Sequence, residues 1–253
     1  MHTPLAWCAI GDSFTYLNDH LDETGYRVTE GYIRRACRLL PELALAPINI
    51  GINGSSTKDW LRHPIPAADL YTILLGTNDW HQGIPLGTTQ AFDAKQEGTI
   101  LGNLAILIDH VRRANPSANL LVMNPVERGD FVCISNALNN AHGSDTPDGG
   151  QYLADIAHGI YVACRRVGVP VLDLHTQSGF SVETAVRFKR VKTPEGYQDL
   201  PYPAYRRCAV DFAHDAYPYP PEAANMTYDG LHPSDKGNQR LAELLAARLR
   251  LLL

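Results

Sequence analysis

Short apolar runs alternate with longer amphipathic stretches along the chain. The apolar runs cover residues 5–10, 47–50, 70–75, 119–123 and 169–174. Each run is four to six residues long and is bounded by Gly, Pro or Asn, which is typical of buried parallel strands. Because strand and helix patterns alternate five times, we predict a five-stranded parallel sheet that helices cover on both faces.

The stretches between the runs carry apolar residues at the i, i+3, i+4, i+7 spacing of a helix. They cover residues 33–40, 100–111 and 153–167, and a last one follows Ser234. Pro41 is expected to stop or kink the first helix, since proline is poorly tolerated inside a helix. Gly168 is a C′ residue for the third helix, and Ser234 is an N-cap for the last one.

Residues 176–228 do not follow this alternation. They show little periodicity, several prolines and half of the twelve tyrosines of the chain. A long irregular stretch inside a compact domain is usually functional, or else its elements have been misassigned. We therefore predict a single domain over residues 1–253, with an irregular Tyr- and Pro-rich insertion at about residues 176–228 that lies over one end of the sheet.

Charge and hydropathy exclude two classes of partner. The 253-residue chain has 22 Lys and Arg against 27 Asp and Glu, a formal net charge of −5. This balance provides no broad cationic surface for phosphates, so we expect no nucleic-acid partner. The longest apolar runs, such as residues 104–108, are far shorter than the roughly 20 residues of a membrane span. We therefore expect no membrane partner.

The N-terminal sequence and the cysteines bear on the cellular compartment. The first ten residues lack a basic region followed by a long apolar one, so they do not resemble a signal peptide. The five cysteines are odd in number and include no CxxC pair, which favours neither a disulfide framework nor a zinc site. We expect a cytoplasmic protein, or a secreted or periplasmic one if an N-terminal signal was removed.

Polar residues follow the predicted strands where a parallel sheet binds its ligands. Ligands bind outside the carboxyl ends of the strands in open α/β sheets. Three segments leave predicted strands and a fourth precedes the last helix: residues 11–15, 51–57, 76–79 and 229–234. All four can therefore converge at one edge of the sheet.

These segments contain the residue types that acyl transfer requires. A serine hydroxyl becomes a nucleophile when an imidazole takes its proton, and a carboxylate orients that imidazole. Ser13, His232 and Asp229 supply the three groups. The tetrahedral oxyanion also requires fixed donors, which the backbone N–H groups of Ser13 and Gly54 and the amide of Asn78 provide. Taken singly, each segment could equally be an ordinary turn or cap.

Together the four segments resemble the four sequence blocks of the SGNH hydrolase superfamily, the GDSL-type esterases and lipases. Its four eponymous residues match, in order, Ser13, Gly54, Asn78 and His232. The blocks extend over residues 11–232, nearly the whole chain. The first block departs slightly, because Phe14 follows the serine where the family often has leucine.

The resemblance implies a flavodoxin-like three-layer α/β/α sandwich and a metal-independent ester hydrolase without a cofactor. It assigns Ser13, Asp229 and His232 to the catalytic triad, and Ser13, Gly54 and Asn78 to the oxyanion hole. Beside these residues, we expect substrate contacts from Asp12, Asp79, His81 and Tyr228. An ordinary loop residue is the alternative for His81.

The tyrosines of residues 176–228, with Arg206 and Arg207, suit stacking on sugar rings and recognition of hydroxyl groups. The leading hypothesis is therefore an esterase that removes a small acyl group, above all acetyl, from a carbohydrate. Alternatively, these tyrosines only pack a long loop onto the core. A lipase or thioesterase for longer acyl chains is a second alternative, and a non-catalytic SGNH-like binding module is a third.

Overall fold

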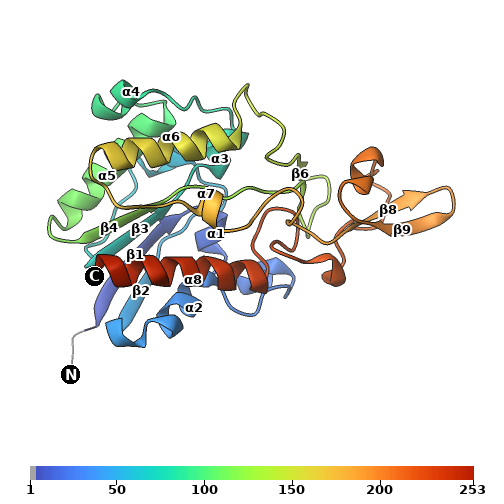
Figure 1. The fold of residues 1–253 in the computed structure, drawn as a ribbon, viewed down its shortest axis with the longest axis horizontal. Helices are drawn as coiled ribbons and strands as arrows, with labels where there is room; N and C mark the ends of the chain where they lie inside the picture. The colour runs from blue at the N-terminus through green and yellow to red at the C-terminus, as the bar shows by residue number, and fades with distance from the viewer. Residues whose placement is uncertain (1–3) are drawn as a thin grey trace.

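Five parallel strands form the centre of the fold in the computed structural model, which describes residues 4–253 (Figure 1). The strands are β1 (Leu5–Gly11), β2 (Leu45–Asn49), β3 (Leu70–Leu74), β4 (Asn119–Met123) and β7 (Val171–Leu172). They lie in the order β2-β1-β3-β4-β7, and each neighbouring pair is parallel. This confirms the predicted five-stranded parallel sheet. The last strand is shorter than predicted, because Leu174 already begins a helix.

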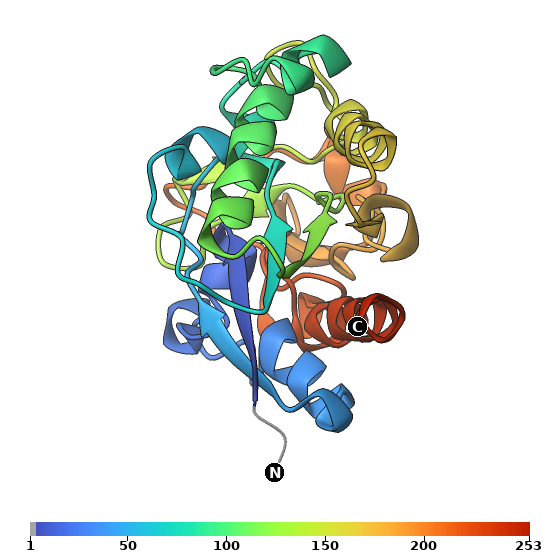
Figure 2. The ribbon, with the colours of Figure 1, turned by 90° about the vertical axis from the view of Figure 1, so that its left-hand side faces the viewer.

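Helices cover both faces of the sheet, as the burial of β1 on both of its faces requires. The helices on one face are α2 (Tyr32–Leu39) and α8 (Asp235–Leu252), and those on the other are α5 (Ile100–Ala114) and α6 (Leu153–Arg166) (Figures 1 and 2). Trp7 and Ala9 pack into the core with α2 and α8. Cys8 and Ile10 pack into the core with α5 and α6. Successive side chains of a strand point to opposite faces, so both layers bury apolar surface against one strand. The three-layer α/β/α fold is therefore confirmed.

The predicted helix boundaries agree with the structure. Helix α2 ends at Leu39, just before Pro41. Gly168 follows α6 with a φ of 72°, which suits a residue without a Cβ. The side chain of Ser234 accepts a hydrogen bond from the backbone N–H of Gly237 and caps α8.

Shorter elements connect these layers. The short α-helices are α1 (Ser13–Tyr16), α3 (Thr77–His81), α4 (Thr89–Asp93) and α7 (Leu174–Gln177). Single 3₁₀ turns cover Leu21–Thr24, Pro41–Leu43, Thr57–Trp60, Ala204–Arg207 and Pro221–Ala223. An antiparallel pair, β5 (Phe131–Val132) and β6 (Asn140–Ala141), follows the main sheet strand β4. None of the helices within residues 4–253 is long and apolar enough to cross a membrane.

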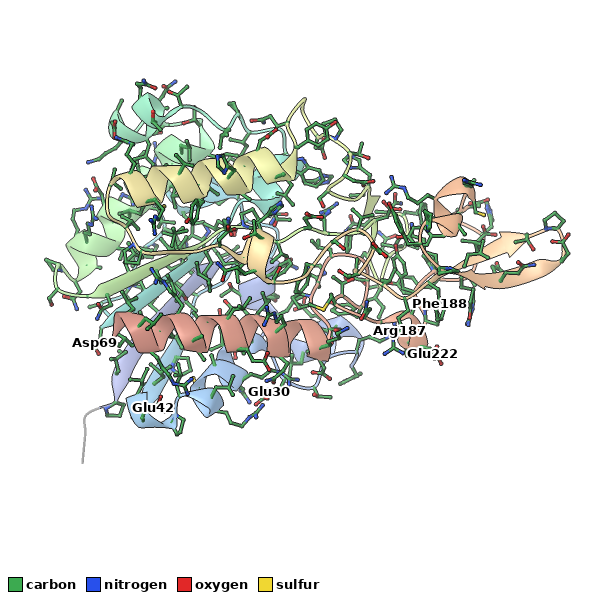
Figure 3. All side chains as sticks on the ribbon, viewed as in Figure 1. Glu30, Glu42, Asp69, Arg187, Phe188 and Glu222 are labelled. Atoms are coloured by element: carbon green, nitrogen blue, oxygen red, sulfur yellow. The ribbon has the colours of Figure 1, made fainter. Side chains whose placement is uncertain are left out.

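Residues 176–228, called the insertion below, are more regular than the sequence predicts. They contain an antiparallel hairpin of β8 (Lys189–Thr193) and β9 (Gly196–Leu200). The hairpin projects beyond the sheet (Figure 1), and Figure 3 labels Arg187 and Phe188 where the chain enters it. A small apolar cluster that includes Val191, Tyr205 and Tyr219 lies at its base. Such a hairpin escapes periodicity analysis because only β8 has a buried face.

Candidate active site

Ser13 lies just beyond the carboxyl end of the inner strand β1, as the first residue of α1. Asp12 caps this helix, because its Oδ1 accepts a hydrogen bond from the N–H of Phe14 at 3.0 Å. A Cβ at Gly11 would lie 2.1 Å from the Thr15 hydroxyl oxygen and 2.8 Å from the Leu74 carbonyl oxygen. Glycine therefore lets the chain turn tightly from the strand into the helix and positions the serine at the edge of the sheet.

A continuous chain of hydrogen bonds joins Ser13, His232 and Asp229. The Nε2 atom of His232 lies 2.9 Å from the Ser13 Oγ, and its Nδ1 lies 2.7 Å from Asp229 Oδ2. Asp229 is buried, and its Oδ1 accepts the backbone N–H groups of Leu231 at 3.0 Å and His232 at 2.7 Å. Because the carboxylate accepts from Nδ1–H, Nε2 is left to accept the serine proton.

Three aromatic rings surround the imidazole of His232. Phe131 meets it edge-on at 5.5 Å between ring centres, and Tyr228 stacks on it at 6.0 Å. The Phe14 ring is tilted against it at 6.1 Å. These contacts restrict rotation of the imidazole and keep it between the serine and the aspartate.

The turn that carries Asp229 and His232 requires glycine at position 230. Gly230 has a φ of 93°, and a Cβ there would lie 1.8 Å from the carbonyl oxygen of Asp130. The N–H of Gly129 donates to the Gly230 carbonyl oxygen at 2.8 Å. The loop 229–232 is therefore packed directly against the chain around Asp130.

The candidate oxyanion donors come from three loops. Asn78 lies on α3, and its Nδ2 donates to the Ser55 carbonyl oxygen at 3.0 Å and to Asp12 Oδ2 at 3.4 Å. Gly54 is exposed, with a φ of 73° and open space where a Cβ would lie. Ser13 begins α1, so its N–H has no intrahelical acceptor. The structure brings these donors to the same sheet edge as the triad.

Asp79 joins the second and third segments. Its carboxylate accepts from the N–H of Thr57 at 3.0 Å and from the Thr57 hydroxyl at 2.5 Å. The Thr57 hydroxyl in turn accepts from Asn103 Nδ2 at 3.0 Å. Asp79 is fully buried, and burial raises the pKa of its carboxyl to about 6 despite these donors. Asp79 therefore holds the Asn78 and Gly54 loops together, and its burial does not fit the expected substrate contact.

Asp12 is also buried beneath the site. Burial raises the pKa of its carboxyl to about 7, although the N–H of Phe14 and the nearby His232 act to lower it. Both carboxyl oxygens face protein donors, Phe14 N–H and the Asn78 amide. The structure therefore favours a role for Asp12 in capping α1 beside Ser13, and not the substrate contact that the sequence suggests.

The two remaining sequence candidates lie beside the site. His81 is half-exposed, and its Nδ1 lies 2.9 Å from Asp148 Oδ2. Tyr228 lines an open pocket of about 410 Å³ that His232 also borders. The further residues of that pocket are Leu17, Asp22, Glu23, Gly25, Asn53, Phe131, Cys133, Ile134, Ser135 and Asp229. Within residues 4–253, no group of three or more His, Cys, Asp and Glu side chains is arranged to hold a metal ion.

Further residues pack around the candidate triad from outside the four segments. Phe131 packs against the His232 ring, and Lys189 and Tyr219 contact Asp130 beside the loop 229–232. No local motif marks them. Arg128 is buried with its guanidinium over the Trp80 ring at 5.0 Å, and burial lowers its pKa to about 10.

A family comparison agrees with this arrangement of strands and loops. The model of the GDSL-like lipase/acylhydrolase family matches residues 9–240, which include all the residues of the candidate triad. The chain belongs to this family. A comparison with curated protein sequences gives no significant match.

Solved structures share the fold of this chain. A protein from Chitinophaga pinensis described as a possible lipase is 42% identical, with a TM-score of 0.94 and 98% of each chain covered. A protein from Lactobacillus plantarum is 20% identical over 100% of both chains, with a TM-score of 0.62. A variant of an acetylxylan esterase from Geobacillus stearothermophilus is 14% identical, with a TM-score of 0.52 and coverage of 98% and 95%. The last two share the fold.

Proposed function

We propose that this GDSL-like hydrolase is a serine carboxylesterase that works through an acyl-enzyme. The single observation that carries the proposal is the unbroken chain from Ser13 Oγ through His232 to Asp229, with both links between 2.7 and 2.9 Å. This is the geometry in which a serine–imidazole–carboxylate set transfers protons.

In the first half-reaction, His232 Nε2 takes the proton of Ser13 while Oγ attacks the ester carbonyl carbon. The tetrahedral intermediate collapses when the imidazolium returns the proton to the leaving alcohol. In the second half, His232 takes a proton from water as the water attacks the acyl-enzyme, and the imidazolium then returns this proton to Ser13 Oγ as the acid leaves. Asp229 holds the imidazole in one tautomer and stabilises its charged form.

The oxyanion is stabilised by the N–H groups of Ser13 and Gly54 and by the amide of Asn78. One Asn78 N–H is committed to the Ser55 carbonyl, whereas the other makes only a 3.4 Å contact with Asp12. Such a long hydrogen bond is weak. This N–H can therefore donate to the oxyanion in the transition state, where charge develops.

The side chains and backbone of the chain supply nucleophile, base, orienting carboxylate and donors, so the proposed reaction uses no metal ion. The substrate that we propose is an acetyl ester of a carbohydrate. The pocket of about 410 Å³ supports this proposal, because it has the size of a small-ligand site. Its lining combines aromatic rings with the carboxylates of Asp22 and Glu23, which can accept hydrogen bonds from sugar hydroxyls.

Most tyrosines of the insertion do not support a carbohydrate substrate in the way that the sequence suggests. Tyr205 and Tyr219 are buried in the apolar cluster of the insertion. Their rings are therefore not free to stack on a sugar. Tyr228 alone of the six lines the pocket at His232.

A panel of esters tests the proposal. The purified protein is assayed with p-nitrophenyl acetate, butyrate and octanoate and with acetylated xylan, with and without EDTA. We expect acetate to be the preferred p-nitrophenyl ester, acetyl release from the polysaccharide, and no effect of EDTA. Preference for octanoate would contradict the carbohydrate deacetylase in favour of a lipase or thioesterase, and loss of turnover with EDTA would contradict the metal-independent mechanism.

A further inference from the structure

Residues 129–132 form a backbone support beside the catalytic loop 229–232. The N–H of Val132 donates to the Asp229 carbonyl oxygen at 3.0 Å. The N–H of Gly129 donates to the Gly230 carbonyl oxygen at 2.8 Å. The Phe131 ring meets the His232 ring edge-on. A displacement of this support would therefore move the aspartate and the histidine together.

The insertion holds this support from the opposite side. The Tyr219 hydroxyl donates to the Asp130 carbonyl oxygen at 2.5 Å, and the Tyr217 hydroxyl donates to the Val132 carbonyl oxygen at 2.8 Å. Lys189 Nζ donates to Asp130 Oδ2 at 2.5 Å. Three side chains of the insertion thus form hydrogen bonds to two residues of the support, Asp130 and Val132.

These contacts are shielded from water. Tyr219 is 0% exposed and Lys189 is 6% exposed. The Lys189 ammonium lies 4.5 Å from the centre of the Tyr205 ring and 5.7 Å from that of Tyr219, so it gains cation–π stabilisation beside its ion pair. Hydrogen bonds and charges in a buried environment constrain geometry more tightly than exposed ones. The contact between the insertion and residues 129–132 is therefore rigid.

We propose that Lys189, Tyr217 and Tyr219 are positioning residues for the catalytic base, acting through residues 129–132 on the loop 229–232. The inference rests on the proposed function, in which His232 accepts the proton of Ser13. Alignment over the 2.9 Å between these two residues limits the rate, since a misplacement of about 1 Å can cost ~10²-fold. The insertion thus contributes to turnover without touching the substrate.

The exposed part of the same hairpin offers matched controls. Lys192 lies on β8 with Lys189, but its side chain is 62% exposed. Tyr197 on β9 is exposed, and its hydroxyl accepts the N–H of Ala216 at 2.8 Å. Tyr219→Phe and Lys189→Met therefore pair with Tyr197→Phe and Lys192→Met, which make the same chemical changes away from the support.

Each variant is assayed for kcat and KM with p-nitrophenyl acetate and for its thermal midpoint. For Tyr219→Phe and Lys189→Met we expect kcat to fall about 10-fold with KM within about twofold, because alignment is lost and not ground-state binding. Tyr197→Phe and Lys192→Met should keep the kcat and KM of the parent protein. Because Lys189→Met removes the ion-pair partner of the partly buried Asp130, the double variant with Asp130→Asn is measured as well, and it should fold while kcat stays low.

A second readout does not depend on a substrate. The Nδ1–H proton of His232 gives a downfield NMR resonance that reports its hydrogen bond to Asp229. We expect this resonance to move upfield in Tyr219→Phe and to stay in place in Tyr197→Phe. An unmoved resonance together with a parent-like kcat, even at a lower thermal midpoint, would overturn the positioning role. A parent protein that hydrolyses no ester would instead contradict the proposed function, whatever the resonance does.

Discussion

The sheet and the insertion contribute to the candidate site through different kinds of contact. Ser13 and Asn78 follow directly after β1 and β3, so the register of the parallel strands brings them together. His232 instead lies on a loop that residues 129–132 and the insertion hold in place. The proposed nucleophile and oxyanion donors are thus placed by the sheet, and the loop of the proposed base is placed by contacts with a peripheral segment.

This difference predicts separate consequences for substitutions in the two regions. A change at the sheet edge should remove a chemical group and leave the fold intact, because these side chains add little to the core. A change where the insertion meets the catalytic loop should alter both stability and alignment. The following predictions test the distinction, starting with the largest effect.

Ser13→Ala should lower kcat by roughly 10⁴- to 10⁶-fold, because the nucleophile is lost. The thermal midpoint should stay close to that of the parent. Esterase kinetics and thermal unfolding measure the two effects. Ser117→Ala, at an exposed turn, is the control, and a serine-reactive phosphonate should label Ser13 alone. Labelling at another serine, with Ser13→Ala still active, would assign the nucleophile elsewhere.

Asn78→Ala should lower kcat by about 10²–10³-fold and leave KM nearly unchanged, since the lost donor acts on the transition state. Asn78→Asp should be no better, because it places an acceptor where an anion develops. Steady-state kinetics with p-nitrophenyl acetate distinguish the cases. A raised KM with preserved kcat would show that Asn78 positions the substrate instead.

Gly54→Ala and Gly230→Ala compare the two regions at glycines of positive φ. At Gly54 the added Cβ meets open space, so we expect the free energy of unfolding to fall by only ~1–2 kcal/mol from backbone strain. At Gly230 it meets the Asp130 carbonyl oxygen at 1.8 Å, and the loss should be about 3 kcal/mol or more. Urea unfolding measures both variants, and equal losses would contradict tight packing between residues 129–132 and the catalytic loop.

Asp12→Asn should change how stability depends on pH. Burial raises the pKa of Asp12 from 3.8 to about 7 in the folded state, so the folded protein binds its proton more tightly than the unfolded chain. The contribution of Asp12 is then complete below about pH 4 and is lost as the pH rises towards about 7. Asparagine does not titrate, so the variant does not lose this contribution. Its free energy of unfolding should therefore fall by roughly 1–3 kcal/mol less than that of the parent between about pH 5 and pH 8.

Urea unfolding at both pH values tests this prediction, with Asp19→Asn as an exposed control. The control should keep the pH dependence of the parent. An Asp12→Asn variant with that same dependence would mean that Asp12 does not retain its proton in the folded protein.

Local patterns predicted most of the sheet layer and the residues at its edge. Apolar runs identified all five strands, and caps such as Ser234 identified helix ends, because apolar runs and capping residues are local features of the sequence. The edge strand β2 is nevertheless mostly exposed, and not buried as its apolar run predicts. The same patterns did not predict the β8–β9 hairpin or the buried state of Asp79. An aspartate is a polar residue in any sequence. Only the folded structure shows that Asp79 is buried and that the N–H and hydroxyl of Thr57 donate hydrogen bonds to its carboxylate.

By itself, the sequence determined which chemical groups the chain brings to the carboxyl edge of a parallel sheet, since strand ends and residue types are local properties. Only the tertiary structure decided how the base is held, because Asp130 meets Lys189 and Tyr219 across long stretches of chain. It also decided the raised pKa of Asp12. Desolvation and long-range hydrogen bonds depend on which segments pack together, and no periodicity along the chain records that packing.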